Sequence, residues 1–169
     1  MKEGWLMGYR AFKDAHPDCP TAESIEILDL IMQRKYAEQI VKGEKKVEFR
    51  NDTKFYYDRL YDKKVLDYIN KHKDDKEVRE AVGRYINPMK MVQSIHFHNY
   101  NNTWSLDVEV RLNDYVRVIK EEVDFLRTRY NSHELDDLLT KCEKARHSEK
   151  KRPIFYYFAL GKIIRRENI

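Results

Sequence analysis

The sequence predicts an α+β fold in which about five strands form a small mixed β-barrel with inserted and flanking helices. Two observations carry this prediction. Runs rich in apolar and β-branched residues open and close the series of elements, at residues 25–32 and 153–166. Between them, segments that alternate apolar and polar residues are interrupted by segments with the period of helices. Because the first and last strands are the most apolar, we expect both to lie inside the barrel.

The N-terminal part of the chain is predicted to form an arm, a strand and a short helix. Residues 1–24 contain aromatic residues and end near two prolines, which favours a short helix or an irregular arm. The run at residues 25–32 has the composition of a largely buried strand. Apolar residues within 36–41 recur at helical spacing, and Gly43 is suited to the left-handed conformation that follows a helix.

A strand over residues 46–50 and a helical section follow. Val47 and Phe49 would point to the core, while Lys46, Glu48 and Arg50 lie on the opposite face. The next residues have helical periodicity with a charged break, and a proline ends them, so we expect a helical insertion over about residues 53–88.

The C-terminal half is predicted to contain a hairpin, two helices and a last strand. Residues 92–98 and 104–112 alternate apolar and polar side chains around a turn-rich segment, as in a β-hairpin. Apolar residues recur at helical spacing from Ile119 to Cys142, with Asn131 or Ser132 as the cap of the second helix. The last strand, residues 153–166, should bend at Gly161.

Length and composition bound the class of protein. With 169 residues, the chain suits a single domain over residues 1–169, including the arm and the insertion. No apolar stretch reaches the roughly 20 residues of a membrane helix, and the first residues lack the apolar core of a signal peptide. Cys19 and Cys142 match no metal-binding spacing. We therefore expect a cytoplasmic protein with reduced thiols, no cofactor and no membrane partner.

The net charge of +4 is concentrated in one segment. Lys141–Arg152 holds six basic and two acidic residues, which accounts for the whole excess. As a functional element this segment would contact phosphates without reading base sequence. Alternatively, it is a solvated helix end whose cations complement the helix dipole. The candidate nucleic-acid contacts are Lys144, Arg146, Lys150, Lys151 and Arg152.

The most specific motif lies between the predicted short helix and the second strand. Gly43, Lys45, Glu48 and Arg50 have the spacing G-x-K-x-x-E-x-R. With the strand and helix before it, this segment, over residues 25–50, resembles the ASCH family, a branch of the PUA-like β-barrels. The resemblance implies a PUA-like fold and a cleft in which these four residues bind RNA or a nucleotide-like ligand.

The spacing itself gives the motif a physical meaning. Glu48 and Arg50 are two residues apart on a strand and project from one face. Lys45 lies an odd number of residues before Glu48, so on a regular strand it would point to the other face. It must therefore reach the same cleft from the turn after Gly43. Two cations should hold Glu48 ionised and leave a net positive charge to meet a phosphate or a base edge. The alternative is an exposed network of little energetic weight.

An enzyme is the alternative function. Some small ASCH proteins resemble amidohydrolases that act on acetylated cytidine, using the signature Lys, a Thr at the position of Glu48, and a Glu before a later helix. Here the Thr is absent, and Glu121, Glu122 and Asp124 do not align clearly with that Glu. Lys45 and Glu48 are the catalytic candidates if the chain is a nucleoside amidohydrolase. A protein-interaction domain that uses the helices is a third hypothesis.

Two histidines on the predicted hairpin are candidate metal ligands. His96 and His98 would share one face, opposite Asp107 and Ser105 respectively. No third ligand is fixed by the sequence, so we predict no metal.

Overall fold

The computed structural model describes residues 2–169, except for the side chains of Lys2, Glu3, Leu6 and Met7. The chain divides into two compact units. The first comprises residues up to Ser24 together with Tyr57–Met91, and the second comprises Ile25–Tyr56 and Val92–Ile169. The arm and most of the insertion expected from the sequence therefore make up one unit, and the candidate motif lies in the other.

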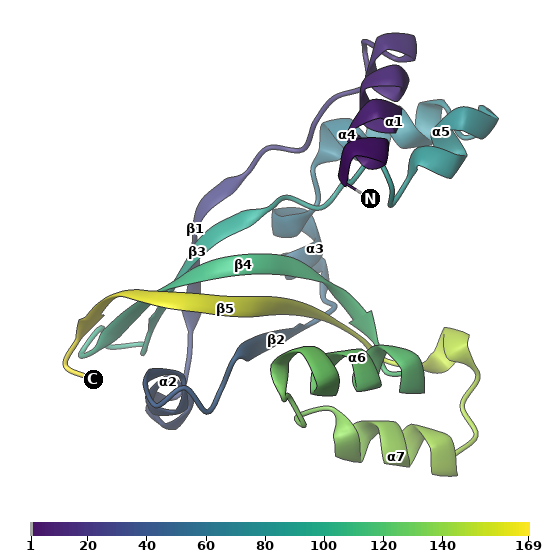
Figure 1. Ribbon diagram of the computed structural model, residues 1–169. Coiled ribbons are helices and arrows are strands. Elements are labelled where there is room, and N and C mark those ends of the chain that lie inside the picture. Colours follow the sequence, from purple (N-terminus) through teal and green to yellow (C-terminus); the bar gives the residue numbers. More distant parts are fainter. Residues whose placement is uncertain (1) are drawn as a thin grey trace. The chain divides into compact units, whose positions relative to one another are not determined.

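The second unit is built on a five-stranded sheet with the strand order β1-β3-β4-β5-β2 (Figure 1). Only β1 and β3 pair in parallel; the other ladders are antiparallel. Its elements are β1 (Ile25–Ile31), α2 (Arg34–Val41), β2 (Val47–Asn51), β3 (Val92–His98), β4 (Ser105–Arg117), α6 (Lys120–Tyr130), α7 (Asp136–Lys144), the 3₁₀ turn η1 (Glu149–Lys151) and β5 (Ile154–Glu167). The short helix α3 (Lys54–Leu60) follows β2.

The α+β class and the mixed sheet of five strands are confirmed, whereas the sheet is not closed into a barrel. β1 and β2 are its two edges, and within the described residues no ladder joins them. The expectation that the first strand lies inside is wrong, since Leu28 and Leu30 are buried while Ile27 is 61% exposed. β-branched residues favour any pleated strand, so the composition of β1 could not distinguish an edge from a centre. β5 does lie inside the sheet, between β4 and β2.

The predicted bend in the last strand is confirmed at Gly161. The register between β4 and β5 shifts on both sides of this residue, which marks β-bulges. A Cβ atom at Gly161 would lie 2.6 Å from the carboxylate of Glu109. That carboxylate accepts a hydrogen bond of 3.2 Å from the backbone N–H of Lys162. A side chain at this position would require the carboxylate of Glu109 to move.

Both faces of β2 are covered. Val47 and Phe49 pack with Val123, Leu126 and Leu139 in a core that includes α6 and α7. Figure 1 shows these two helices side by side after the end of β4. On the opposite face, Glu48 and Arg50 are paired with Phe158 and Tyr156 of β5 and share the face of these buried rings. The motif side chains therefore project into the interior of the curved sheet.

The first unit is helical and consists of α1 (Lys2–Ala15), α4 (Lys63–Lys71) and α5 (Lys76–Ala81). Its core contains Phe12, Val65, Tyr68 and Val78. Asp62 caps α4 and also accepts a hydrogen bond of 3.0 Å from the backbone N–H of Glu23. This hydrogen bond, together with those at the cap, lowers the pKa of the Asp62 carboxyl. None of the helices in the described part of the chain is long and apolar enough to span a bilayer.

The β3–β4 hairpin has the predicted register, with His96 opposite Asp107 and His98 opposite Ser105. His96 Nδ1 pairs with the carboxylate of Asp107. His98 Nε2 lies 2.5 Å from Asp29 Oδ1, and its Nδ1 lies 2.9 Å from the carbonyl oxygen of Asn99. Because both partners of His98 are acceptors, the protonated ring, in which both nitrogens donate, satisfies both contacts. His98 thus links β1 to the end of β3.

This link makes stability depend on pH. The hydrogen bond to Asp29, followed by that to Asn99, raises the pKa of His98 above its ordinary 6.5. The stabilisation is therefore complete below that value and is lost as pH rises through the raised pKa. We expect Asp29→Asn to remove it, at a cost below about 1 kcal/mol because Asp29 is exposed. Urea unfolding at a series of pH values measures this, with Glu26→Gln as the control. An Asp29→Asn effect that does not vary with pH would contradict the link.

Candidate functional site

The motif begins where α2 ends. Gly43 has φ of +75°, a left-handed conformation that glycine adopts without steric cost. The backbone N–H of Gly43 donates to Ile40 at 3.0 Å and that of Lys45 donates to Gln39 at 3.2 Å. This turn directs the Lys45 side chain inward, so that it reaches the carboxylate of Glu48 despite its opposite parity. The approach predicted from the spacing is confirmed.

Lys45 is held between two carboxylates. Its Nζ lies 2.5 Å from Glu134 Oε1 and 3.4 Å from Glu48 Oε2. The ammonium also lies 5.9 Å from the centre of the Tyr36 ring, within the range of a cation–π contact. Lys45 is buried, and so is Glu48, whereas the Glu134 side chain is 47% exposed. Lys45 therefore connects a buried carboxylate to one that faces solvent.

Burial dominates the chemistry of Glu48. Loss of solvent raises the pKa of its carboxyl, and this outweighs the lowering by the ammonium of Lys45 and the guanidinium of Arg50. The nearby carboxylate of Glu134 raises the pKa further. The two cations therefore do not lower the pKa of Glu48 on balance, contrary to the prediction from the spacing, because Glu48 lies in the interior of the curved sheet rather than in an open cleft. The alternative of an exposed, weak network is excluded for the same reason.

Arg50 joins the two edges of the sheet. Its guanidinium lies 3.0 Å from Glu48 Oε1 and donates to the carbonyl oxygen of Ile31, at the end of β1, also at 3.0 Å. A longer hydrogen bond of 3.4 Å goes to the hydroxyl of Tyr56. Its Nε is buried and has no hydrogen-bond partner within the described residues. A side chain thus spans the gap between β1 and β2 that no backbone ladder closes.

Glu134 is the site residue that sequence reasoning missed. It lies in the loop between α6 and α7, just before the N-terminus of α7. The candidates weighed from the sequence, Glu121, Glu122 and Asp124, all lie in α6. The family resemblance implies a Glu just before a later helix. Glu134 fits that position better than the three residues of α6 do. The prediction that Asn131 or Ser132 caps this helix is wrong, since Leu135 is the N-cap of α7 and Asn131 ends α6 with φ of +51°.

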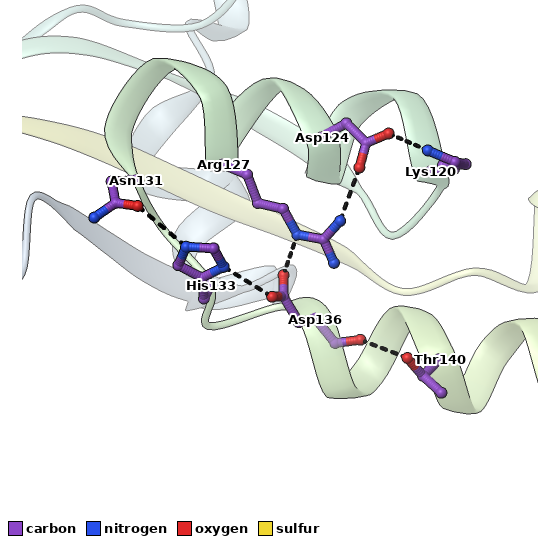
Figure 2. A network of polar contacts seen from close by, with 7 residues as sticks. All are labelled: Lys120, Asp124, Arg127, Asn131, His133, Asp136 and Thr140. Carbon is purple, nitrogen blue, oxygen red and sulfur yellow. Dashed lines mark hydrogen bonds and ion pairs between the residues drawn. The ribbon is translucent and has the colours of Figure 1, made fainter.

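A polar network holds the loop that carries Glu134. In Figure 2, Arg127 of α6 reaches Asp136 at the start of α7, with Nε 2.7 Å from Oδ1. His133 Nδ1 lies 3.0 Å from the other oxygen of Asp136, and His133 Nε2 lies 3.1 Å from Asn131 Oδ1. Although burial alone would raise the pKa of Asp136, the hydrogen bonds from Arg127 and His133 lower it on balance. The residues on either side of Glu134 are thereby fixed.

An open pocket of about 400 Å³ lies at this end of the second unit. Of the four motif residues, only Lys45 lines it; Glu48 lies behind the ammonium, and Arg50 lies farther toward β1. Of the three side chains predicted to line one cleft, Lys45, Glu48 and Arg50, Lys45 alone lines this pocket. Its lining residues are Gln39, Glu44, Lys45, Lys46, Asn131, Ser132, His133 and Glu134.

The pocket does not carry the positive charge expected from the motif. Its wall holds two basic residues, Lys45 and Lys46, and two acidic ones, Glu44 and Glu134. The basic segment Lys141–Arg152 begins near the other end of α7, whose nine residues span about 13 Å. Within it, Arg152 donates to the carbonyl oxygens of His147 at 2.9 Å and Val118 at 3.2 Å, so this arginine anchors the loop.

The arrangement suits proton transfer and hydrogen bonding to a polar ligand. A buried carboxyl with a raised pKa, an ammonium and an exposed carboxylate lie in one chain of contacts that ends at the pocket. Within the described residues, no group of three or more His, Cys, Asp or Glu side chains could hold a metal ion. The histidines of the hairpin form carboxylate pairs instead.

Comparisons with known proteins give one informative match. No family model matches the chain, and no curated protein matches it. Among solved structures, the chain is similar to a mutant of the ZmASCH protein from Zymomonas mobilis, with a TM-score of 0.41 and 14% identity. The alignment covers 86% of this chain and 76% of that chain.

The pH dependence of stability tests the burial of Glu48. In the folded protein the carboxyl of Glu48 stays protonated to a higher pH than in the unfolded chain, where its pKa has the ordinary value of 4.5. The free energy of unfolding should therefore fall as pH rises from 4.5 through the raised pKa. We expect Glu48→Gln to remove this fall, while Glu38→Gln on the exposed face of α2 keeps it. Equal pH slopes for wild type and Glu48→Gln would show that Glu48 is not desolvated.

Proposed function

We propose that the pocket beside Lys45 binds a nucleoside-like ligand, either free or as one unit of an RNA chain. The observation that carries this proposal is the buried ammonium of Lys45 at the wall of a pocket of about 400 Å³. This volume is in the range of pockets that hold small ligands. The amides of Gln39 and Asn131 and the hydroxyl of Ser132 could bond to a base edge or a ribose. The ASCH resemblance of the motif supports the same ligand class.

The neutral charge of the pocket favours hydrogen bonding over phosphate neutralisation at this position. A ligand oxygen that approaches Lys45 must compete with Glu134, whose contact of 2.5 Å occupies one of the three N–H donors. Glu134 is exposed and lies in a loop, so it can turn toward a ligand donor as the ligand binds. The basic segment, with Lys144, Arg146, Lys150 and Lys151, is proposed to contact the phosphates of a longer RNA. A cytoplasmic location and a protein partner remain predictions.

Calorimetric titration with cytidine, cytidine monophosphate and a short RNA tests binding. We expect Lys45→Gln to weaken all three ligands by at least about tenfold, since it removes a charged hydrogen bond worth about 1.5–3 kcal/mol. Lys42→Gln, an exposed lysine of the same helix end, is the matched control. Replacing Lys144, Arg146, Lys150 and Lys151 by Gln should weaken only the RNA and reduce its salt dependence. Absence of binding by all three ligands at low salt would refute the proposal.

A second candidate function, amide hydrolysis, is favoured by the pair of Lys45 and Glu134. The carboxylate of Glu134 is placed to take a proton from water as the water oxygen attacks the acyl carbon of an N-acylated nucleoside. Lys45 would stabilise the negative charge that develops on the carbonyl oxygen. The proton then passes from Glu134 to the departing amine as the C–N bond breaks, giving a carboxylic acid and the free amine. Glu48, where hydrolase-like ASCH proteins have Thr, would hold the ammonium.

Incubation with a panel of N-acylated nucleosides tests this candidate. If it is correct, Lys45→Ala and Glu134→Gln should each lower kcat/KM by at least about 10²-fold, the usual contribution of an acid–base group. Lys42→Ala should leave turnover unchanged. Turnover that survives Lys45→Ala would rule out the assigned role, and no turnover with any acyl group would leave binding as the function.

A further inference from the structure

The first unit has a pocket of its own. It measures about 360 Å³ and lies between the N-terminal helix α1 and the segment that follows α5. Three aromatic residues line it, Trp5 and Tyr9 from α1 and Tyr85 from the segment after α5. The proposed function does not use this pocket, and all of its lining residues belong to the first unit.

The aromatic rings form a platform in which Trp5 and Tyr9 are stacked and Tyr85 is tilted by 54° and 58° against them. Trp5 and Tyr9 lie with ring centres 5.2 Å apart and planes within 7°, and Tyr85 lies 6.1 Å from Trp5. The hydroxyl of Tyr85 would lie 2.1 Å from a Cβ atom at Gly8, so glycine at this position lets the ring approach α1. The indole N–H of Trp5 donates to the carbonyl oxygen of Arg84 at 3.2 Å. These contacts fix the orientation of the indole.

Part of the Trp5 ring in this platform is open to solvent. Trp5 remains 44% exposed although one ring face stacks on Tyr9 and its N–H is hydrogen-bonded. By contrast Phe12, about two turns farther along the helix, is buried in the core of the unit. An indole held in place with part of its surface open can extend the stack to another flat ring.

The charges of this pocket differ from those of the Lys45 pocket. Lys13 and Arg84 line it, and within the described residues its walls contain no carboxylate. The guanidinium of Arg84 lies 4.9 Å from the centre of the Tyr85 ring, while Lys13 Nζ donates to the carbonyl oxygen of Cys19 at 2.6 Å. Arg84 and Tyr85 also border a neighbouring pocket, which Glu77 and Glu80 line. The wall of the first pocket, with two cations and no carboxylate beside partly open aromatic rings, suits a ligand that is both flat and anionic.

We propose that this pocket binds a nucleotide, with the base stacked on the platform of Trp5, Tyr9 and Tyr85 and the phosphate paired with Arg84 and Lys13. The nucleotide is either a free molecule or one unit of a single-stranded nucleic acid. Stacking is tolerant of the base, because each base has an aromatic face, so we expect weak base selectivity. The site is independent of the Lys45 pocket and would persist if the function proposed there failed.

Tryptophan fluorescence gives a direct readout of stacking. Trp104 is buried, so a ligand that stacks on the platform should quench only the exposed Trp5. The titration uses the full chain carrying Lys45→Gln, which weakens binding at the other pocket. The probes are uridine monophosphate, an oligouridine, uridine and inorganic phosphate. Saturable quenching by the monophosphate and the oligouridine is expected. Equal affinities indicate a free nucleotide, and tighter binding of the oligouridine indicates a strand.

Variants then test the assigned contacts. Binding of a labelled oligouridine is followed by fluorescence anisotropy. Trp5→Ala should weaken this binding by roughly 5- to 150-fold. Arg84→Gln should reduce the slope of log affinity against log salt by about 0.7, whereas Arg79→Gln, on the exposed part of α5, should not. Trp5→Ala also removes packing contacts of α1 and could unfold the first unit. In that case the comparison of Arg84→Gln with its control Arg79→Gln still tests the proposal. Quenching by no nucleotide, equal binding of inorganic phosphate, or an unchanged slope in Arg84→Gln would overturn the proposal.

Discussion

Two cations and two carboxylates alternate along one line, from Glu134 through Lys45 and Glu48 to Arg50, and this line ends at the carbonyl oxygen of Ile31. Backbone ladders join each strand of the second unit to its neighbours, and Arg50 adds a link between the two edge strands, which no ladder joins within the described residues. Breaking a buried ion pair leaves an uncompensated charge and costs about 3–5 kcal/mol. The same contacts therefore link the edges of the sheet and deliver an ammonium to the pocket.

The burial of this cluster explains its chemistry. In an open cleft, the two cations would lower the pKa of Glu48 and the site would be a simple phosphate binder. Inside the sheet, beside Phe158 and Tyr156, desolvation outweighs their effect and the pKa of Glu48 rises. Glu134 supplies the charge balance from outside. Both proposed functions of the pocket follow from this division, since Lys45 is fixed from behind by Glu48 and only its contact with Glu134 is open to exchange with a ligand.

The Lys45 pocket and the aromatic pocket of the first unit have contrasting compositions. The pocket at Lys45 is polar and its charges are balanced, and its walls offer amides, a hydroxyl and an imidazole. The pocket of the first unit offers stacked rings and two cations. The first arrangement favours recognition through directed hydrogen bonds, while the second favours a flat anion with little selectivity. A chain with both kinds of pocket can combine a selective contact with a general one, which is a common division in proteins that bind nucleic acids.

Local patterns were enough to predict much of the molecule. The sequence by itself determined the short helix, the turn at Gly43, the strand with Val47 and Phe49 facing the core, the hairpin register and the bend at Gly161, because these depend on neighbouring residues and on periods of 2 and 3.6. Only the tertiary structure decided that β1 is an edge, that the sheet stays open, that Glu48 is buried, and that Glu134 lies 2.5 Å from Lys45. These facts depend on contacts between residues far apart in the chain, 89 positions in the case of Lys45 and Glu134, and on desolvation, which no local pattern encodes.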